Sequence, residues 1–309
     1  MKNLFLFILI ASIISCNQTP TKQPEKMTPE QLLKLPYTST IDNAEREYFV
    51  YLPKNYEKDP NKKWPVLMFL HGDGERGNGK DELDYVIIHG PLYEAWIQKR
   101  DLPFVMIVPQ MHMFGRDTIG LDYITNRKPE WIPKRLEGDS VPKRPDTYVM
   151  EQKMNAISPV SFDSIPFTES KDGWNKSEQD LLGMLDHVKN NYNVDTNRFY
   201  LSGLSYGGFG TWYMASKHPD LFAAINPVVG WAHPDLIEPI AKAKIPIWAF
   251  AGGRDGGVRK EFFYEGMNKL EELGHRNIRY TVHEEMGHDT WRRVYGGQDI
   301  YDWLLEHSK

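Results

Sequence analysis

The sequence predicts an α/β fold in which a mostly parallel sheet carries helices on both faces. Short, continuous apolar runs such as residues 66–70 are typical of strands that are buried on both faces. Segments with helical spacing of apolar residues alternate with these runs, as expected when helices connect parallel strands. Hydrophobic residues make up 40% and charged residues 26% of the 309-residue chain, which argues against wholesale disorder.

The expected elements follow one another from about Tyr37 onward. Residues 47–52 alternate between apolar and polar in strand fashion. The other expected strands are residues 66–70, 104–108, 199–201, 222–229, 245–251 and 278–282. A capping box, Ser177-Glu178-Gln179-Asp180, predicts a helix start, and further helices are expected around residues 206–214, 262–274 and 300–305.

Residues 111–173 form a long insertion after an early core strand. This segment is polar, contains six prolines and shows no sustained period. A loop of this length inside a compact domain is uncommon and is usually functional. Two interpretations stay open: a lid or substrate-binding region in which Trp131 is an exposed aromatic, or an inert decoration that varies between relatives.

The N-terminal residues have the pattern of a secretory signal. Lys2 precedes an apolar run at residues 4–14, which is too short to cross a bilayer as a mature helix. Cys16 is the only cysteine, so an intramolecular disulfide is excluded. We therefore expect residues 1–15 to be a signal peptide, residues 16–36 a flexible tether, and residues 37–309 one folded domain.

Ile13-Ile14-Ser15-Cys16 resembles the lipobox of bacterial lipoproteins. The resemblance implies that Cys16 carries lipid and anchors the protein to a membrane of the bacterial cell envelope, facing the periplasm or the cell surface. The alternative is an ordinary cleavable signal with a coincidental cysteine.

A nucleophile elbow is predicted at Gly203-Leu204-Ser205-Tyr206-Gly207. The motif follows the expected strand at residues 199–201 and opens a helix, which is the context in which a sharp turn exposes the central serine. A bare G-x-S-x-G pattern recurs by chance, so the alternative is a plain turn serine. The strand before it and the helix after it favour Ser205 as a nucleophile.

Partners for Ser205 follow in a recognisable order. Asp255 ends an apolar strand, and His288 follows the last expected strand by a short loop. Nucleophile, acid and base in the order Ser, Asp, His are typical of α/β-hydrolases, in which imidazole takes the serine proton and the carboxylate orients the imidazole. The rival acids are Asp220 and Asp235, and the rival base is His283.

The turn His71-Gly72-Asp73-Gly74 ends the strand at residues 66–70. In this fold that position supplies the second donor of the oxyanion hole. We expect the backbone N–H groups of Asp73 and Tyr206 to be the donors, and a merely structural turn is the alternative.

Two further motifs are misleading. Gly72-Asp73-Gly74-Glu75-Arg76-Gly77 matches the dinucleotide pattern, but no good helix start follows it and no acidic strand end lies about twenty residues later. The histidines of His283-Glu284-Glu285-Met286-Gly287-His288 are five apart, and Gly287 interrupts any helix, so they do not form a zinc-protease motif. We expect no metal and no cofactor.

The net charge of −5 with no basic stripe gives no support to a nucleic-acid partner.

At this level the chain resembles a group of secreted bacterial esterases near carbohydrate esterase family one, which includes feruloyl and acetylxylan esterases; some relatives are called predicted peptidases. The motifs that carry the resemblance are Leu70–Gly77, Gly203–Gly208 and Gly287-His288-Asp289-Thr290-Trp291. It covers about residues 40–110 and 175–309. It implies that Ser205 is the nucleophile, Asp255 the acid, His288 the base and the His71–Gly74 turn part of the oxyanion hole.

The sequence thus predicts a serine esterase that cleaves acetyl or feruloyl esters of plant polysaccharides through an acyl-enzyme. The alternatives are a serine peptidase of the prolyl-oligopeptidase clan, which uses the same triad, and a non-catalytic glycan-binding lipoprotein. Trp131, Trp231 and His233 are candidate substrate-binding residues, because aromatic faces suit sugar rings and feruloyl groups. Their alternative role is simple packing. The acyl group, the alcohol and the oligomeric state stay open.

Overall fold

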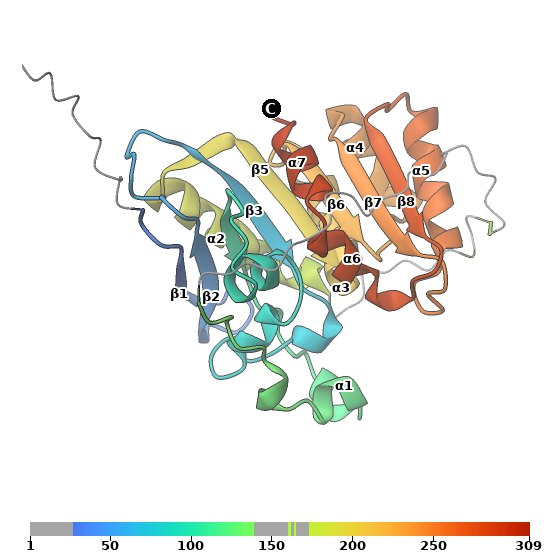
Figure 1. The fold of residues 1–309 in the computed structure, drawn as a ribbon. Helices are drawn as coiled ribbons and strands as arrows, with labels where there is room; N and C mark the ends of the chain where they lie inside the picture. The colour runs from blue at the N-terminus through green and yellow to red at the C-terminus, as the bar shows by residue number, and fades with distance from the viewer. Residues whose placement is uncertain (1–26, 139–159, 162–163, 165–172) are drawn as a thin grey trace, which may run out of the picture.

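The computed structural model describes residues 27–138, 160–161, 164 and 173–309. Among these residues, eight strands form one sheet in the order β1-β2-β4-β3-β5-β6-β7-β8 (Figure 1). The strands are β1 (Gln31–Thr38), β2 (Glu45–Leu52), β3 (Trp64–Leu70), β4 (Val105–Val108), β5 (Val194–Leu204), β6 (Ala224–Val228), β7 (Ile247–Gly252) and β8 (Ile278–His283).

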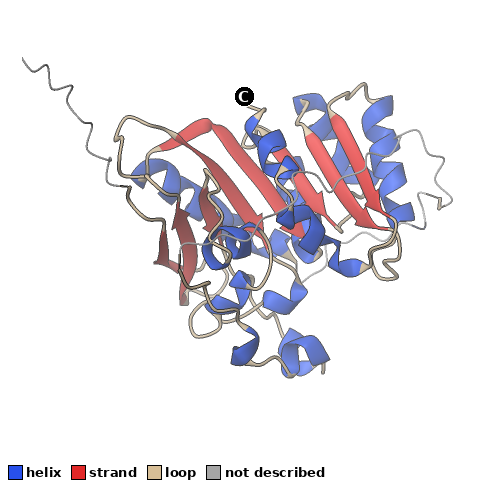
Figure 2. Cartoon of the chain, viewed as in Figure 1, coloured by secondary structure: helices blue, strands red, loops and turns tan. Residues whose placement is uncertain are grey.

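The sheet is parallel except at one edge. β1 pairs with β2 and β2 pairs with β4 in antiparallel fashion, whereas every other neighbouring pair is parallel. The carboxyl ends of the parallel strands therefore meet at one edge, where the arrowheads lie in Figure 2. Ligands bind at this edge in open α/β sheets. The predicted fold class, a mostly parallel α/β sheet, is confirmed.

Helices cover both faces of the sheet. Figure 1 shows α6 and α7 in front of the sheet and α2 and α3 behind it. The α-helices of the described residues are α1 (Asp122–Thr125), α2 (Glu178–Asn191), α3 (Tyr206–Lys217), α4 (Ile237–Ala243), α5 (Phe263–Glu272), α6 (Trp291–Gly296) and α7 (Asp299–Leu305).

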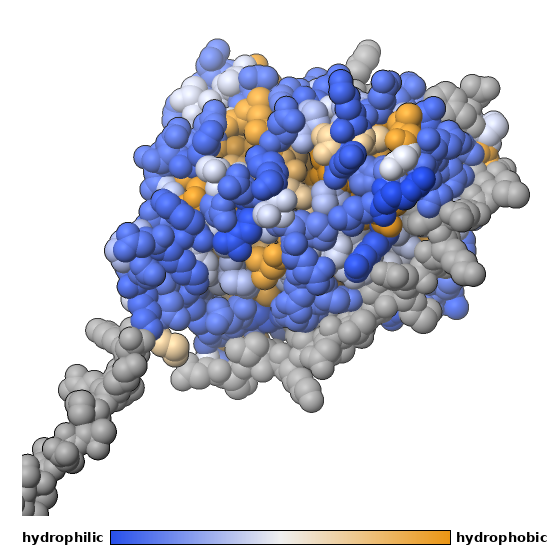
Figure 3. Space-filling view, turned by 90° about the horizontal axis from the view of Figure 1, so that it is seen from above, coloured by the Kyte–Doolittle hydropathy of each residue, from blue (hydrophilic) through white to orange (hydrophobic). Residues whose placement is uncertain are grey.

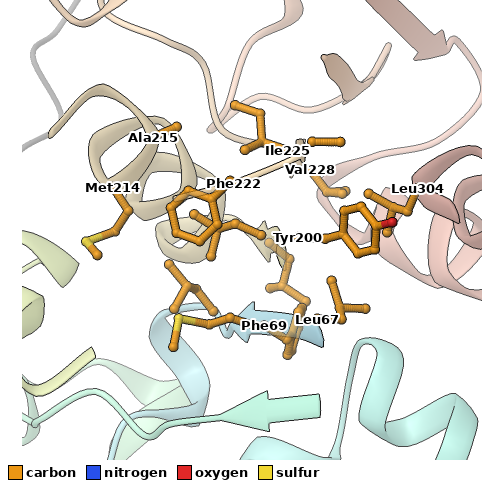
Figure 4. Packing of buried hydrophobic residues seen from close by; sticks show 14 of the residues in the cluster. Leu67, Phe69, Tyr200, Met214, Ala215, Phe222, Ile225, Val228 and Leu304 are labelled. Carbon is orange, nitrogen blue, oxygen red and sulfur yellow. The ribbon is translucent and has the colours of Figure 1, made fainter. Parts of the chain in front are cut away.

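The core explains why the central strands are continuous apolar runs. Every residue of β3 is buried, because helices cover both of its faces. In Figure 4, Leu67 and Phe69 of β3 lie near Tyr200 of β5, with Met214 of α3 and Leu304 of α7 also in the cluster. All five side chains are fully buried. The sheet is thus held rigidly between its helices, which fixes the positions of the loops at its carboxyl edge.

The expected boundary of the tether at residues 16–36 is wrong. Gln31–Thr38 forms β1, which pairs along its whole length with β2. Thr28 also exchanges two hydrogen bonds with Asn55, so the folded part begins before the strand. β1 is an edge strand that is only half buried and contains Pro36, and its pattern therefore lacks the apolar run by which a central strand is recognised.

The predicted helix start at Ser177 is correct, but its capping box does not form. The Ser177 hydroxyl makes no capping hydrogen bond. Asp180 instead accepts hydrogen bonds from the hydroxyls of Ser39 (2.6 Å) and Thr40 (2.7 Å). Ser39 also lies 3.3 Å from His112 Nε2. These contacts join the β1–β2 turn to α2, so the Asp180 carboxylate that local capping would use is already bonded to distant residues.

The described first part of the insertion, residues 111–138, is not structureless. It contains the short helical turns Arg116–Thr118, Asp122–Thr125 and Pro129–Trp131. Each turn has only three or four residues, so no helical period can appear in the sequence. Tyr148, a further aromatic residue of the insertion, lies outside the described residues.

Figure 3 views the molecule from above the orientation of Figure 1, and the described surface on this face is mainly hydrophilic, with separate hydrophobic areas. Within the described residues, none of the helices is both long enough and apolar enough to cross a membrane. The signal segment at residues 1–15 and Cys16 lie outside the described residues.

Candidate active site

The nucleophile elbow lies at the carboxyl end of β5. Ser205 connects β5 to α3 with a φ of 51° and a ψ of −116°, a conformation that side chains rarely adopt. Gly203 and Gly207 make the turn possible: a methyl group on Gly207 would overlap the carbonyl oxygen of Leu70, and one on Gly203 would overlap that of Gly207. Both glycines of the motif are therefore required by close backbone approach.

Ser205, His288 and Asp255 form one hydrogen-bonded chain. His288 Nε2 lies 3.0 Å from Ser205 Oγ, and His288 Nδ1 lies 2.6 Å from Asp255 Oδ2. These are the distances at which a base takes a serine proton and a carboxylate orients the base. The side chain of His288 is 41% exposed and that of Asp255 is 1% exposed, so the site is open on the histidine side.

The surroundings of the Asp255 side chain stabilise its ionised form. Its Oδ1 accepts hydrogen bonds from the backbone N–H groups of Gly257 and Val258, each at 2.9 Å. Burial alone would raise the pKa of Asp255, but the bond from His288 and the two backbone bonds outweigh burial and lower this pKa below its ordinary value. The carboxylate is therefore ionised at neutral pH, where it stabilises an imidazolium at His288.

The rival residues lie elsewhere. His283 ends β8, where it is 2% exposed and its ring is parallel to that of Phe250. Burial lowers the pKa of His283 to about 4, with a further contribution from Arg293. Asp235 sits beside His233, and the Asp220 carbonyl oxygen accepts a hydrogen bond from Lys309. His288 and Asp255 are the residues that the structure brings to Ser205.

The turn after β3, predicted as part of the oxyanion hole, is fixed by His71. The Nδ1–H of His71 donates to the carbonyl of Gly72 (2.6 Å), and Nε2 accepts the backbone N–H of Met111 (2.9 Å). Together these bonds require a neutral ring. Burial agrees with this, because it lowers the pKa of His71 to about 4. Trp174 packs edge-on against the same ring and donates its indole N–H to the His71 carbonyl.

The side chain of Asp73 is the centre of a clamp formed by Arg76, Arg116 and Tyr123. Its carboxylate accepts hydrogen bonds from Arg76 Nε (2.5 Å), the Tyr123 hydroxyl (2.8 Å) and Arg116. The two guanidinium groups lie 5.0 and 5.5 Å from the ring centre of Tyr206. The clamp thus joins Asp73 to Tyr206, the two residues whose N–H groups were predicted as oxyanion donors.

Arg116 and Tyr123 were not predicted as site residues. Both come from the insertion, whose polar sequence has no period and no motif that marks these two side chains. Arg116 could not be found as a partner of the Asp73 carboxylate by spacing, because it lies 43 residues away.

The triad opens into a cavity of about 450 Å³ lined by Ser205 and His288. Tyr206, Phe209 and Trp231 give it an aromatic wall. The rings of Phe209 and Trp231 pack at 4.8 Å in an edge-to-face arrangement. Trp231, predicted as a substrate-binding residue, therefore lies at the triad.

The other two predicted substrate-binding residues lie away from the triad cavity. Trp131 is 53% exposed and lines a second cavity with His89 and Trp291. His233 is not among the residues that line either cavity; it is buried, and its Nδ1 accepts the backbone N–H of Asp235. The His233 ring caps its own short helical turn, and its role in substrate binding stays a prediction.

A search of the described residues for metal sites finds no group of three or more His, Cys, Asp or Glu side chains that could hold an ion. Ser205, His288 and Asp255 supply a nucleophile, a base and an acid in one hydrogen-bonded chain.

Comparison with known proteins gives short sequence matches. A model of the prolyl oligopeptidase family matches residues 167–235, which include the elbow. Poly(3-hydroxyalkanoate) depolymerase C of Paucimonas lemoignei is 45% identical over 47 residues, 15% of this chain and 11% of that protein. A bifunctional acetylxylan esterase/xylanase of Neocallimastix patriciarum is 35% identical over 81 residues, 26% of this chain and 12% of that protein.

A structural match covers most of the chain. The crystal structure of a thermostable esterase is similar over 90% of this chain, with a TM-score of 0.58 and 25% sequence identity. The match covers 63% of that esterase, and the two sequence matches cover much smaller parts of their relatives. The parallel sheet, the elbow and these similarities together place the chain in the α/β-hydrolase superfamily, beside its esterases.

Proposed function

We propose that this chain is a serine carboxylic-ester hydrolase that removes acetyl or feruloyl groups from plant polysaccharides. The observation that carries the proposal is the hydrogen-bonded chain from Ser205 through His288 to Asp255. The similarity of this protein to part of an acetylxylan esterase/xylanase and to a thermostable esterase supports an ester substrate. The aromatic wall at Trp231 supports a substrate with flat apolar surface, such as a feruloyl group or a sugar ring.

In the first half of the reaction, His288 Nε2 takes the proton of Ser205 as Oγ attacks the acyl carbon. The carbonyl oxygen becomes an oxyanion, for which the N–H groups of Asp73 and Tyr206 are the proposed donors. The bond between the acyl carbon and the alcohol oxygen then breaks, and His288 gives its proton to that oxygen. The products are the free alcohol and an acyl group bound to Ser205.

In the second half, water attacks the acyl-enzyme. His288 takes a proton from the water and returns it to Ser205 Oγ as the ester bond to the serine breaks. The products are the free carboxylic acid and the original enzyme. Asp255 keeps the proton of His288 on Nδ1 in the resting state and stabilises the imidazolium in both halves.

A serine peptidase is the second candidate, because the prolyl oligopeptidase family model matches residues 167–235. Purified protein is to be compared on 4-nitrophenyl acetate, methyl ferulate, acetylated xylan, a long-chain lipid ester and a dipeptide amide. We expect the highest kcat/KM on a carbohydrate-linked ester. Faster cleavage of the amide or the lipid ester would contradict the proposed substrate.

The clamp around Asp73 predicts the effect of Arg116→Ala. Loss of this guanidinium removes one bond to the Asp73 carboxylate and one contact with Tyr206, so the two oxyanion donors are held less precisely. Removing a donor outright costs about 100-fold or more, and we expect loosening the pair to lower kcat about tenfold with little change in KM. Steady-state kinetics on 4-nitrophenyl acetate measure both constants.

Arg198→Ala is the matched control for Arg116. Arg198 forms a similar ion pair with Asp195, but this pair belongs to the opposite end of β5 from Ser205. The kcat of the Arg198→Ala variant should stay at the wild-type level. The Arg116→Lys variant should retain more kcat than Arg116→Ala because lysine keeps the positive charge. An equal fall in both alanine variants would mean that general destabilisation is the cause.

We further propose that Cys16 carries lipid and holds the enzyme on the cell envelope. The support is the sequence Ile13-Ile14-Ser15-Cys16 after an apolar run, with no other cysteine in the chain. In the native host, Cys16→Ser should move the protein from the membrane fraction to the soluble fraction. A wild-type protein that fractionates as soluble with Cys16 absent or unmodified would contradict the anchor.

A further inference from the structure

A second cavity lies next to the triad and has no role in the chemistry described above. Its volume is about 350 Å³, and its walls include Tyr93, Trp131 and Trp291 together with the polar side chains of His89 and Arg292. We name it the His89 cavity. The cavity is open to solvent at Trp131 and Arg292, because the side chains of both residues are exposed.

Trp291 links the His89 cavity to the catalytic base. The indole ring stands edge-on to the ring of His288, with centres 5.1 Å apart, and in the same way it contacts His89, with centres 5.4 Å apart. Trp291 therefore forms a wall of the cavity on one side and supports the base on the other. A ligand in the cavity lies one aromatic ring away from His288.

The ring of His89 is held in one orientation by a buried carboxylate. Its Nδ1 lies 2.5 Å from Glu75 Oε1, and Glu75 is only 5% exposed. Because Nδ1 is directed at Glu75, Nε2 is the ring nitrogen left for a hydrogen bond with a ligand. Glu75 therefore fixes the orientation of His89 in a wall that also carries the aromatic rings of Tyr93, Trp131, Trp291 and Tyr295 and the charged side chains of Glu94 and Arg292.

This combination of groups suits a sugar. Aromatic faces pack against the apolar face of a pyranose or furanose ring, and a hydrogen-bonding imidazole and a guanidinium at the edge suit its hydroxyl groups. The triad cavity differs, because Phe209, Trp231 and Val258 give it a mainly apolar lining. An ester has an apolar acyl part and, in a polysaccharide, a sugar on its alcohol side. The two cavities match these two parts.

Proton transfer indicates which part lies near Trp291. His288 must give its proton to the alcohol oxygen, so the sugar that carries this oxygen begins at His288. We propose that the His89 cavity is the subsite for the carbohydrate on the alcohol side of the ester, while the acyl group occupies the triad cavity. The inference rests on the proposed esterase function and assigns the substrate specificity of that site.

Trp131→Ala tests the subsite with little risk to folding, because Trp131 is 53% exposed. On acetylated xylo-oligosaccharides we expect KM to rise about tenfold, the effect of losing one aromatic stacking contact. On 4-nitrophenyl acetate, which lacks the sugar, kcat and KM should stay at wild-type values. The control is Leu273→Ala, which removes a similarly exposed apolar side chain that lines neither cavity.

A binding measurement separates failure of the subsite from failure of the esterase proposal. Ser205→Ala protein is titrated with unesterified xylo-oligosaccharide and followed by tryptophan fluorescence, with and without Trp131→Ala. Binding that Trp131→Ala weakens supports the subsite even if the wild type cleaves no ester, in which case only the esterase proposal falls. Absence of binding, or an unchanged KM for the oligosaccharide esters, overturns the subsite. A rise in KM for methyl ferulate but not for the acetylated oligosaccharides also overturns it, because the cavity would then bind the acyl part.

Discussion

Ser205→Ala is expected to reduce ester hydrolysis about a million-fold, the typical cost of removing a triad nucleophile. The reason is geometric: Ser205 Oγ is the atom that lies 3.0 Å from His288 Nε2, and the elbow holds it there with a φ of 51°. Alanine removes one oxygen atom and leaves the turn unchanged. Initial rates on 4-nitrophenyl acetate, with thermal unfolding of both proteins, measure the effect and check the fold.

A fluorophosphonate probe gives an independent measure of the same residue. The wild type should be labelled at Ser205, as read by peptide mass spectrometry, and the Ser205→Ala variant should take up no label. Ser202 is the matched control, because it lies on β5 three residues before Ser205 but is buried and bonded to the carbonyl of Asn226. Labelling at another serine, or hydrolysis retained in the Ser205→Ala variant, would contradict the assigned nucleophile.

Asp255→Asn is expected to lower kcat about 10⁴-fold, the size of effect that the same change has in another serine hydrolase. The structure explains why the amide cannot substitute for the acid. The N–H groups of Gly257 and Val258 both point at Oδ1, so the asparagine oxygen must stay on that side. The asparagine NH₂ group then faces His288 Nδ1 and donates to it, which forces the ring proton onto Nε2. A protonated Nε2 cannot accept the proton of Ser205.

Asp235→Asn is the control, since Asp235 is also near a histidine but its side chain is 69% exposed. We expect its kcat to remain at the wild-type level. The tautomer at His288 can be read directly from the imidazole ¹⁵N chemical shifts of wild-type and Asp255→Asn proteins. If the Asp255→Asn variant retained most of its kcat, the orienting role of Asp255 would have to be abandoned.

The sequence alone was sufficient for the parallel sheet and for the triad. Central strands such as β3 are buried on both faces, so they appear as continuous apolar runs. The elbow is equally local, because the approach of Gly207 to the carbonyl of Leu70 excludes any side chain and leaves glycine in the motif. Asp255 and His288 could be proposed because each directly follows an apolar strand or its short loop, and the chain order narrows the choice.

Elements whose stability comes from distant partners were beyond prediction from the sequence. β1 is an edge strand without a single fully buried residue, and the Ser177 capping box was displaced by contacts between Asp180 and the β1–β2 turn. Neither outcome is encoded by neighbouring residues. Both depend on which side chains the fold brings within hydrogen-bonding distance.

The same distinction holds at the site. The residues that form the bonds of the triad were determined by local motifs, whereas the surroundings of the triad were decided by tertiary structure alone. Arg116 reaches Asp73 across 43 residues, and the His89 cavity combines side chains from before β4, from the insertion and from α6. His233 lies close to Trp231 in sequence but caps its own turn. Residues of one site need only lie close together in space. When long connections fold back onto the sheet edge, the spacing of residues along the chain does not indicate which of them become neighbours.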